Sequence, residues 1–288
     1  MSGGTNMTPT DKAGVLVEAL PYIRRFWGKV VVVKYGGNAM TDPDLAARFA
    51  EDVVLMRSVG MKPVVVHGGG PQIGDLMTRL GKVPEFRDGL RVTDAETLDI
   101  ARMVLVGKVR SDIVSAINVH GPLAVGVSGE DAGLIVAAAR DPALGYVGDV
   151  EAVNPGLVER LLAEDLIPVV STIGSDASGQ AYNINADTAA AAVGVALGAE
   201  KLVYLTNVEG LLRAVEDPAS LVNVIGADEL DKLIASGELA GGMAPKARSC
   251  VHAVRNGVRQ AHIVDGRVPH VLLLEIFTNQ GIGTMVTP

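Results

Sequence analysis

The stretch VVVHGGGPQIG, residues 64–74, joins an apolar run to three consecutive glycines. A second stretch of the same design, VVVKYGGNAM, occupies residues 31–40. Each predicts a buried strand that ends in a glycine-rich turn, and Pro71 suits the first turn of a following helix. Glycines let backbone N–H groups approach an anion closely, and a helix that begins after them adds its positive end. The two turns therefore predict one binding site supplied from two sides, with plain tight turns as the alternative.

The same design recurs along the chain. The apolar, β-branched runs are KVVVVKY from residue 29, KPVVVHG from 62, LAVGVSG from 123, LIPVVST from 166, KLVYLTN from 201 and AHIVDG from 261. Ala- and Leu-rich segments with helical spacing separate them. Apolar strands that alternate with helices predict an α/β fold of three layers, α/β/α, around one continuous, mostly parallel sheet. Open sheets of this kind bind ligands at the carboxyl ends of their strands.

The chain is expected to have two parts. Residues 1–28 form an N-terminal arm, whose helix begins near Thr10 or Asp11 and is kinked at Pro21. This helix has no obvious place in the sheet, so it packs either on another subunit or on its own core. Residues 29–288 form a single domain with two functional halves.

The composition is that of a folded globular protein, with 48% hydrophobic residues and a formal net charge of −8. This charge disfavours non-specific binding to nucleic acid or to an anionic membrane, since both need excess Lys and Arg. No run approaches the roughly 18 apolar residues of a membrane span, and the first 28 residues lack a secretory signal, so we expect a cytoplasmic protein. The single cysteine and five histidines show no zinc spacing. Cys250 is interpreted as a small packed residue, with a reactive thiol as the alternative.

Four charged residues occur where a ligand could use them. Lys34 stands at the end of the first strand, where an unpaired ammonium group needs a ligand or a carboxylate. Arg91, in RDGLRVTD, offers a planar fork for a carboxylate. Asp187 begins an apolar helix in NINADTAAAA, and Lys246 follows two glycines in GGMAPK. The alternatives are a helix N-cap for Asp187 and ordinary surface charges for Arg91 and Lys246.

Neither glycine turn is a known nucleotide fingerprint. The sequence has no G-x-x-x-x-G-K-[ST] loop and no clean G-x-G-x-x-G after a strand. A dinucleotide-dependent oxidoreductase, which the parallel sheet alone would allow, is therefore disfavoured.

Taken together, these segments resemble the amino-acid kinase family, and within it the acetylglutamate kinases of the arginine-sensitive type. The resemblance runs in order over nearly the whole chain from residue 29. It is carried by VVVKYGGNAM, VVVHGGGPQI, DGLRVTD, GVSGEDAGLI, IPVVSTIG, YNINADTAAAAVG, YLTNVEGLL and GGMAPKARSC. GLRVTD and NINAD favour the acetylglutamate enzymes over the aspartate, carbamate and uridylate kinases of the same fold.

The resemblance implies ATP-dependent phosphorylation of the side-chain carboxylate of N-acetyl-L-glutamate, a step of arginine biosynthesis. It also implies that residues from about 29–170 hold the amino-acid substrate and residues from about 171–288 hold the nucleotide. In these enzymes the amides of the second and third glycines of HGGG bind the substrate, and an arginine and an asparagine bind its carboxylate end. The matching residues are Gly69, Gly70, Arg91 and Asn183. The nucleotide-binding residues implied in the same way are Gly36, Gly37, Thr206, Asn207 and Gly210.

The resemblance also implies the catalytic residues. Lys34 and Lys246 would stabilise the transferred phosphoryl group, and Asp187 would orient both ammonium groups. Mg²⁺ would bridge oxygens of ATP, and the sequence shows no dedicated protein cage for it. A carboxylate acceptor is already ionised at neutral pH and needs no base. His67, which precedes the glycines, is therefore interpreted as structural, with a general base as the alternative.

Regulation is a further implication. Arginine-inhibited relatives are hexamers, built as rings of dimers whose N-terminal helices interlace, so we expect a homohexamer inhibited by L-arginine. The effector contacts implied are His270, Glu275 and Gly283, and the alternative is that this tail is only an edge strand and a turn. Glu130 occupies a position where many relatives carry a basic residue, with no predicted consequence.

Two other functions remain open at this point. The chain could be another enzyme of the same fold, such as a carbamate kinase or a glutamate 5-kinase. It could also be a non-catalytic regulatory protein that keeps the fold. The presence of Lys34, Asp187 and Lys246 together disfavours the second reading.

Overall fold

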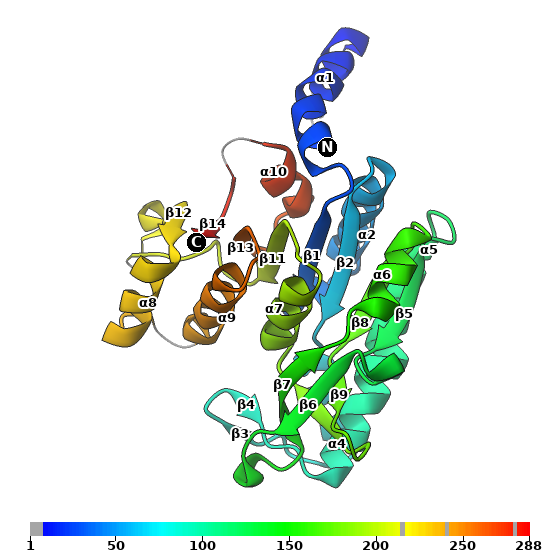
Figure 1. The fold of residues 1–288 in the computed structure, drawn as a ribbon, viewed down its shortest axis with the longest axis vertical. Helices are drawn as coiled ribbons and strands as arrows, with labels where there is room; N and C mark the ends of the chain where they lie inside the picture. Colours follow the sequence, from blue (N-terminus) through cyan, green and yellow to red (C-terminus); the bar gives the residue numbers. More distant parts are fainter. Residues whose placement is uncertain (1–7, 214–216, 240–241, 279–280) are drawn as a thin grey trace.

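The computed structural model describes residues 8–213, 217–239, 242–278 and 281–288 of the 288-residue chain. Its centre is an eight-stranded sheet with the strand order β12-β14-β13-β11-β1-β2-β8-β5 (Figure 1). The strands of this sheet are β1 (Val30–Tyr35), β2 (Lys62–His67), β5 (Ala124–Ser128), β8 (Ile167–Ser171), β11 (Lys201–Thr206), β12 (Val224–Gly226), β13 (Gln260–Asp265) and β14 (Thr284–Thr287).

The sheet is mostly parallel, as the sequence predicts. The neighbouring strands β13, β11, β1, β2, β8 and β5 all run in the same direction. These six strands are the six apolar runs identified in the sequence. β14 runs antiparallel to β13, and β12 pairs parallel with β14 at the edge.

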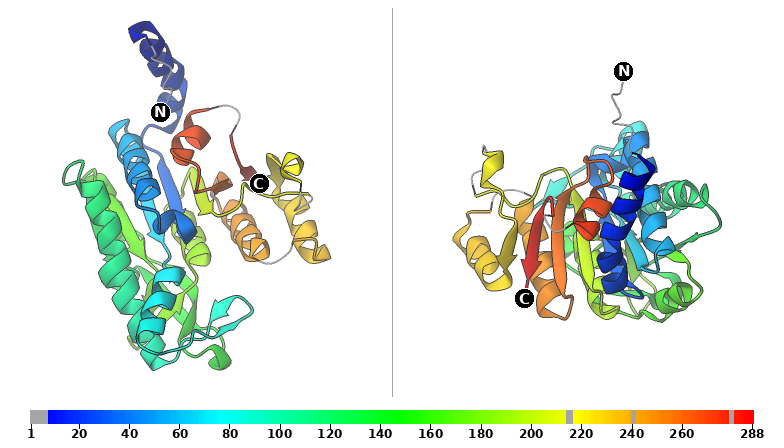
Figure 2. Two further views of the ribbon diagram at one scale, coloured as in Figure 1. Left: turned by 180° about the vertical axis from the view of Figure 1, so that it is seen from behind. Right: turned by 90° about the horizontal axis from the view of Figure 1, so that it is seen from above.

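Helices cover both faces of the sheet (Figure 2), so the predicted three-layer α/β/α architecture is confirmed. The helices are α1 (Pro9–Phe26), α2 (Pro43–Ser58), α3 (Gly70–Arg79), α4 (Ala95–Arg102), α5 (Arg110–Asn118), α6 (Gly156–Ala163), α7 (Ala186–Ala196), α8 (Ala227–Ser236), α9 (Met243–Arg255) and α10 (Val271–Phe277). A π-helical segment, η2 (Met103–Val109), joins α4 to α5. The short 3₁₀ turns are η1 (Gly37–Met40), η3 (Asp131–Gly133), η4 (Pro142–Leu144) and η5 (Pro218–Ser220).

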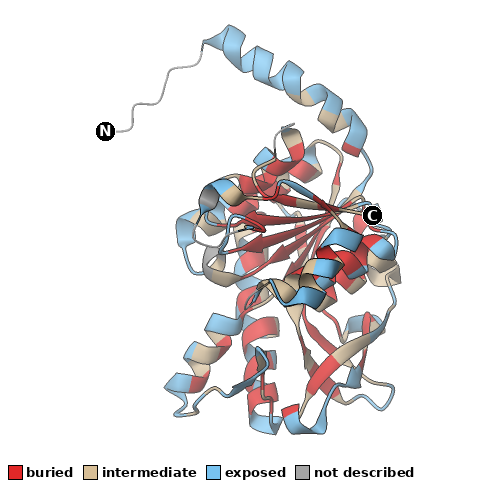
Figure 3. Ribbon diagram, turned by 90° about the vertical axis from the view of Figure 1, so that its left-hand side faces the viewer, coloured by how far each residue is buried: buried red, intermediate tan, exposed pale blue. Residues whose placement is uncertain are grey.

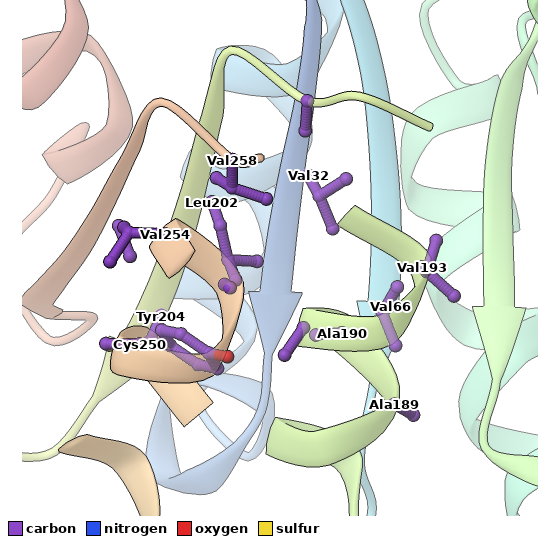
Figure 4. Packing of buried hydrophobic residues seen from close by; sticks show 14 of the residues in the cluster. Val32, Val66, Ala189, Ala190, Val193, Leu202, Tyr204, Cys250, Val254 and Val258 are labelled. Atoms are coloured by element: carbon purple, nitrogen blue, oxygen red, sulfur yellow. The ribbon is translucent and has the colours of Figure 1, made fainter. Parts of the chain in front are cut away.

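The hydrophobic core has one cluster on each face of the sheet. Alternate residues of β1 point to opposite faces. Val32 belongs to the cluster that includes residues of α6, α7, α8 and α9, whereas Val31 and Val33 belong to the cluster that includes residues of α2, α3, α5 and α10. Figure 4 shows the first cluster, in which Cys250 of α9 lies among buried apolar side chains. Cys250 is fully buried, and burial raises the pKa of its thiol. The structure therefore confirms that Cys250 is a packed residue.

A second, smaller sheet lies beyond the carboxyl ends of the central strands (Figure 1), so the prediction of one continuous sheet is wrong. It is closed in the order β10-β7-β6-β9. Its strands are β6 (Ile135–Ala139), β7 (Val147–Val153), β9 (Ile173–Ser175) and β10 (Ala181–Ile184), and a separate hairpin is formed by β3 (Phe86–Arg87) and β4 (Leu90–Arg91). These strands are short or carry polar residues, so they do not appear as apolar runs in the sequence. β9 and β10 lie past residue 170, yet they pair with β6 and β7 of the first half.

Helix α1 projects from the rest of the molecule and is exposed over most of its length (Figure 3). Its N-cap is Thr8, whose hydroxyl accepts from the amide of Asp11, and the Asp11 carboxylate accepts from the amide of Thr8. The predicted helix start near Thr10 or Asp11 is therefore displaced to Thr8, because Asp11 is the N3 residue of a capping box whose N-cap is Thr8. The helix includes Pro21, and Phe26 at its end is buried. Residues 1–7 of the predicted arm lie outside the described residues.

Among the described residues, no helix has both the length and the apolar character that crossing a bilayer requires.

Candidate active site

The two glycine turns leave the sheet side by side. Strands β1 and β2 are parallel neighbours (Figure 1). Their last residues, Tyr35 and His67, lie opposite each other. The amide of Gly68 donates to the carbonyl of Tyr35 at 2.9 Å, which ties the second turn to the end of the first strand. The turns therefore open onto one edge of the sheet, as their sequences predict.

Three charged side chains meet at this edge. Nζ of Lys34, near the end of β1, lies 3.0 Å from Oδ1 of Asp187. Nζ of Lys246, in the first turn of α9, lies 2.9 Å from Oδ2 of the same carboxylate. The side chains of Lys34 and Asp187 are only 11% and 8% exposed. One carboxylate thus holds two ammonium groups, and the constellation keeps one net positive charge.

The start of α7 fixes the position of Asp187. The N-cap of this helix is Asn185, whose Oδ1 accepts from the amides of Asp187 and Thr188 at 2.9 and 3.2 Å. The hydroxyl of Tyr204 donates to the carbonyl of Asp187 at 3.1 Å. Tyr204 is also the residue of β11 that lies opposite Lys34. The N-cap role considered for Asp187 therefore belongs to Asn185, which leaves the carboxylate of Asp187 facing the two lysines.

The charge of Asp187 depends on its partners. Burial alone would raise the pKa of this carboxyl, but the nearby charges of Lys34 and Lys246 outweigh burial, and its pKa lies below the ordinary value. Asp187 is therefore ionised at neutral pH. Because the group is buried, removing the lysines would leave a carboxylate without compensation.

The first glycine turn is packed too closely for side chains. A Cβ added to Gly36 would lie 2.8 Å from Nζ of Lys34. Gly37 has a φ of +74°, and a Cβ there would lie 2.8 Å from Oδ1 of Asn207. Glycine at both positions lets the backbone come close to Lys34 and Asn207.

A cavity of about 420 Å³ opens at this turn. Lys34 and Lys246 lie in its wall, and so do all five residues for which a nucleotide contact is predicted. Its described lining is Lys34, Gly36, Gly37, Leu205, Thr206, Asn207, Val208, Gly210, Leu211, Leu212, Glu238, Leu239, Gly242, Met243 and Lys246. The wall thus combines a charged, glycine-rich end with an apolar end.

The second glycine turn has a different environment. Gly69 is the N-cap residue of α3, and a Cβ there would lie 2.7 Å from Leu105 of the π-helical segment. Gly70 is exposed, and a Cβ there would meet nothing within 4 Å. Packing therefore requires glycine at position 69, whereas position 70 borders open space at the start of a helix.

Arg91 lies against this turn. Its Nη2 donates to the carbonyl of Gly70 at 2.9 Å, and its guanidinium lies 4.7 Å from the centre of the Phe86 ring. Arg91 is buried, and burial lowers its pKa. Among the described residues, no Asp or Glu forms an ion pair with it. The interpretation of Arg91 as an ordinary surface charge is therefore wrong.

Asn183 lies near Arg91 through a shared neighbour. Nδ2 of Asn183, in β10, donates to Oγ1 of Thr93 at 3.3 Å. The same hydroxyl donates to the carbonyl of Arg91 at 2.8 Å. The two residues predicted to bind a carboxylate are thus bonded to one threonine.

His67 has the environment of a structural residue. It is fully buried, and its Nδ1 lies 2.9 Å from the carbonyl of Gly68. Burial is the main cause that lowers the pKa of His67 to about 4. The ring is therefore neutral at physiological pH and donates its Nδ1 hydrogen to Gly68.

A second cavity, of about 190 Å³, lies at the opposite end of the sheet, between the end of α1, β13 and α10. Glu275 and Gly283 line it, together with Lys201 and His262. Oε1 of Glu275 lies 2.6 Å from Nδ1 of His262, and Nζ of Lys201 lies 3.1 Å from the other ring nitrogen. Burial lowers the pKa of Lys201 to about 8. One buried carboxylate thus lies beside two nitrogen bases.

His270 is not part of this cavity, so the expectation that it lies with Glu275 and Gly283 is wrong. It is the N-cap residue of α10, with a φ of 57°, and its Nδ1 lies 2.6 Å from Oδ1 of Asp52 in α2. The left-handed backbone turns the His270 side chain towards α2. The histidine that lines the cavity with Glu275 and Gly283 is His262 of β13.

Several residues of these sites were not predicted from the sequence. Asn185 stands two residues before Asp187 and could have been found as the N-cap of an Ala-rich helix. Thr93, Tyr204, Lys201 and His262 lie within ordinary strand or loop sequence, and only the pairing of strands brings them to the sites. Glu130 pairs with Arg102 at 2.9 Å between their side chains. The described residues contain no cluster of three or more His, Cys, Asp or Glu side chains that could hold a metal ion.

Comparison with known proteins agrees with this arrangement. The model of the amino acid kinase family matches residues 29–265. The acetylglutamate kinase of Moorella thermoacetica is 50% identical, with 98% of this chain and 99% of the relative covered. That of Acidothermus cellulolyticus is 55% identical, with 96% and 97% covered.

A solved structure with the same fold is N-acetylglutamate synthase from Neisseria gonorrhoeae, complexed with coenzyme A and N-acetyl-glutamate. The match has a TM-score of 0.84 and 29% identity, and it covers 96% of this chain but only 63% of the synthase. A second structure of that synthase, complexed with coenzyme A and L-arginine, matches with a TM-score of 0.79 and 27% identity over 96% of this chain and 65% of the synthase. The family model and the full-length relatives lead to one conclusion: the chain belongs to the amino acid kinase family, among its acetylglutamate kinases.

Proposed function

We propose that this chain transfers the γ-phosphoryl group of ATP to the side-chain carboxylate of N-acetyl-L-glutamate, as a step of arginine biosynthesis. The observation that carries the proposal is the pairing of Lys34 and Lys246 with Asp187, where the cavity of about 420 Å³ meets the glycine turns. The full-length relatives at 50% and 55% identity support the choice of substrate.

The chemistry needs positioning and positive charge more than proton transfer. The acceptor carboxylate is ionised at neutral pH, so it attacks without a general base. Phosphoryl transfer passes through a loose transition state with negative charge on the transferred oxygens. Lys34 and Lys246 would stabilise that charge, because both side chains line the cavity and pair with the same carboxylate. Asp187 would hold them in place through its two oxygens.

The cavity at the first turn suits a nucleotide. Gly36 and Gly37 would face the phosphates, because both line the cavity together with Lys34. Thr206, Asn207 and Gly210 would contact the rest of the nucleotide. The apolar end of the cavity would take the base. Mg²⁺ prefers oxygen ligands and would accompany ATP, supplying positive charge that neutralises its phosphates.

The second turn would hold the amino-acid substrate. The amides of Gly69 and Gly70 stand at the positive end of α3 and suit an anionic or carbonyl group. Arg91 is buried without a carboxylate partner among the described residues, so the α-carboxylate of the substrate would complete its contacts. Asn183 would bind the same carboxylate through its amide.

The test is ATP consumption by the purified protein with N-acetyl-L-glutamate and Mg²⁺, trapping the acyl phosphate with hydroxylamine. We expect hydroxamate with this acceptor and little with glutamate, aspartate or carbamate. Hydroxamate from one of those acceptors alone would replace the substrate and keep the reaction class. No product with any of them would overturn the proposal and favour a non-catalytic protein.

We further propose that L-arginine inhibits the enzyme by binding in the cavity of about 190 Å³. Glu275 would pair with the guanidinium group, and Lys201 would attract the carboxylate of the effector. Gly283 lies in the wall of the same cavity. Support comes from the charge pattern of the cavity and from the structural relative that was solved with L-arginine.

The proposed assembly is a hexamer built as a trimer of dimers. Helix α1 exposes four large apolar side chains that its own chain does not cover: Val15, Leu16, Val17 and Leu20. A second α1 could bury this surface, and the end of α1 also borders the proposed effector cavity. We also propose a cytoplasmic location, where the ATP that the reaction needs is available.

A further inference from the structure

Thr93 joins the two residues that are proposed to bind the substrate carboxylate, although it is not itself part of the predicted site. It follows the β3–β4 hairpin that carries Arg91, and it is fully buried. The role inferred for Thr93 rests on the proposed phosphorylation of N-acetyl-L-glutamate.

The main chain of Thr93 is held from two directions. Its amide donates to the carbonyl of Leu144 at 2.9 Å, and its carbonyl accepts from the amide of Tyr146 at 2.7 Å. The carbonyl of Tyr146 in turn accepts from the amide of Asn183 at 2.9 Å. Gly145 lies between these contacts with a φ of +69°, and a Cβ there would collide with the carbonyl of Thr93. The backbone positions of Thr93 and Asn183 are therefore fixed relative to each other.

The hydroxyl of Thr93 closes this ring of hydrogen bonds. It has one hydrogen, which it donates to the carbonyl of Arg91 at 2.8 Å. Towards Asn183 the hydroxyl can therefore only accept, and it selects the amide nitrogen of Asn183, at 3.3 Å. A free asparagine amide can turn over and present its oxygen or its nitrogen. Here the hydrogen bond to Thr93 fixes which way the Asn183 amide faces, and the second hydrogen on Nδ2 stays available to a ligand.

The orientation matters for a carboxylate ligand. A carboxylate only accepts hydrogen bonds, so it is attracted by an amide N–H and repelled by an amide oxygen. The same hydroxyl also satisfies the carbonyl of Arg91, the residue whose guanidinium lies against Gly70. The Asn183 amide and the Arg91 backbone thus both hydrogen bond to Oγ1 of Thr93.

We propose that Thr93 is a positioning residue for the acylated amino acid: its hydroxyl orients the amide of Asn183 and the backbone of Arg91 so that both can donate to the substrate carboxylate. Thr93 does not touch the reacting groups. Its contribution lies in substrate binding and not in phosphoryl transfer.

The test is Thr93→Val, which keeps the shape of the side chain and removes the hydroxyl. Loss of an ordinary hydrogen bond predicts a KM for N-acetyl-L-glutamate raised about 3- to 10-fold, with kcat and the KM for ATP within about twofold of wild type. Thr93→Ser restores the hydroxyl and should return KM to within about twofold of wild type. The control is Ser171→Ala, which removes another buried hydroxyl, one that donates to the carbonyl of Val127 at 3.3 Å.

A double-mutant cycle separates positioning from general destabilisation. If Thr93 acts through Asn183, then Thr93→Val adds little to the rise in KM already caused by Asn183→Ala. Additive effects, an unchanged KM in Thr93→Val, or an equal rise in Ser171→Ala would each overturn the inference. Should Thr93→Val not fold, Thr93→Ala takes its place, and equal KM values for N-acetyl-L-glutamate in Thr93→Ala and Thr93→Ser would overturn the inference.

The wild-type enzyme keeps this inference distinct from the proposed function. If wild-type protein forms no hydroxamate from N-acetyl-L-glutamate, the proposed function fails, and the inference fails with it. If wild-type protein is active and Thr93→Val retains the wild-type KM, only the role of Thr93 fails.

Discussion

Nζ of Lys246 lies 2.9 Å from Oδ2 of Asp187, a contact that joins the first turn of α9 to the first turn of α7. Lys34, on β1, occupies the other carboxylate oxygen at 3.0 Å. Three elements from distant parts of the chain thus meet at one acidic group. Each of the three side chains can be altered separately.

Replacing either lysine should reduce turnover far more than it reduces folding. Loss of one preorganised electrostatic partner costs about 2.7–4 kcal/mol of transition-state stabilisation, so Lys34→Ala and Lys246→Ala should lower kcat about 100- to 1000-fold. The hydroxamate assay measures this directly. Lys108→Ala, which breaks a surface pair with Asp112, is the matched control and should keep wild-type turnover. Near-normal rates in the two active-site variants would remove both lysines from the mechanism.

Asp187→Asn should destabilise the fold, because it leaves two ammonium groups together without their carboxylate. Breaking a buried pair in this way costs about 3–5 kcal/mol, measured by urea unfolding at pH 7. Adding Lys34→Met to this variant should recover part of the loss. The folded pKa of Asp187 is lowered, so its contribution is present above about pH 4 and is lost as the pH falls through the folded value. A variant as stable as wild type would mean that the three charges do not depend on one another.

Asp52 should show the opposite dependence on pH. Burial is the main cause that raises its pKa to about 6, although the contact with His270 opposes the rise. A carboxyl whose folded pKa is raised contributes stability that is present below about pH 4 and is lost as the pH rises through about 6. The free energy of unfolding of Asp52→Asn minus that of wild type should therefore increase between these pH values. The control is Asp44→Asn, an exposed change in the same helix. A flat difference for Asp52→Asn, or the same slope in both variants, would contradict the prediction.

The two neighbouring glycines of the second turn should respond differently to alanine. A Cβ on Gly69 would lie 2.7 Å from Leu105, so Gly69→Ala should lower stability by about 1–3 kcal/mol. A Cβ on Gly70 would meet nothing within 4 Å, so Gly70→Ala should fold normally and raise the KM for N-acetyl-L-glutamate by entering the proposed substrate space. Thermal unfolding and steady-state kinetics separate the two effects. Equal loss of stability in both variants would argue that the turn as a whole is rigid.

The apolar side of α1 should control assembly. Leu16 is 72% exposed, so Leu16→Asp should leave the monomer fold intact and reduce the molecular mass found by light scattering from that of a hexamer to that of a dimer. Deletion of residues 1–27 should likewise give a dimer, retain catalysis and abolish the response to L-arginine. Glu18→Gln, a change in the same exposed helix, is the control. An arginine response that survives the deletion would break the proposed link between assembly and inhibition.

Sequence patterns predicted the parts of the fold that rest on apolar runs. All six strands of the parallel core were found because burial on both faces makes each of them continuously hydrophobic. β7, β9 and β10 were missed, because short strands with polar positions leave no comparable signal. These missed strands bring Asn183 to its place.

The candidate site also divides into residues that the sequence pattern predicts and residues that it does not. Lys34 and the glycines were found because they interrupt apolar strands at positions where such residues have no packing role. Thr93 and His262 were not found, since their importance depends on which residues lie beside them. The resemblance implied His270 as an effector contact, and only the placement of β13 and α10 shows that His262 lines the cavity with Glu275 and Gly283.

The second sheet also has a consequence for the order of synthesis. β9 and β10 complete a sheet that begins with β6 and β7, so a nascent chain that has emerged only to residue 170 lacks the strands that close it. The first half cannot finish folding until β10 has left the ribosome, and Asn183 reaches Thr93 in that same step. Lys34 then gains Asp187 from the next helix to appear, and Lys246 arrives later with α9. The growing protein therefore assembles its proposed amino-acid site before its proposed nucleotide site.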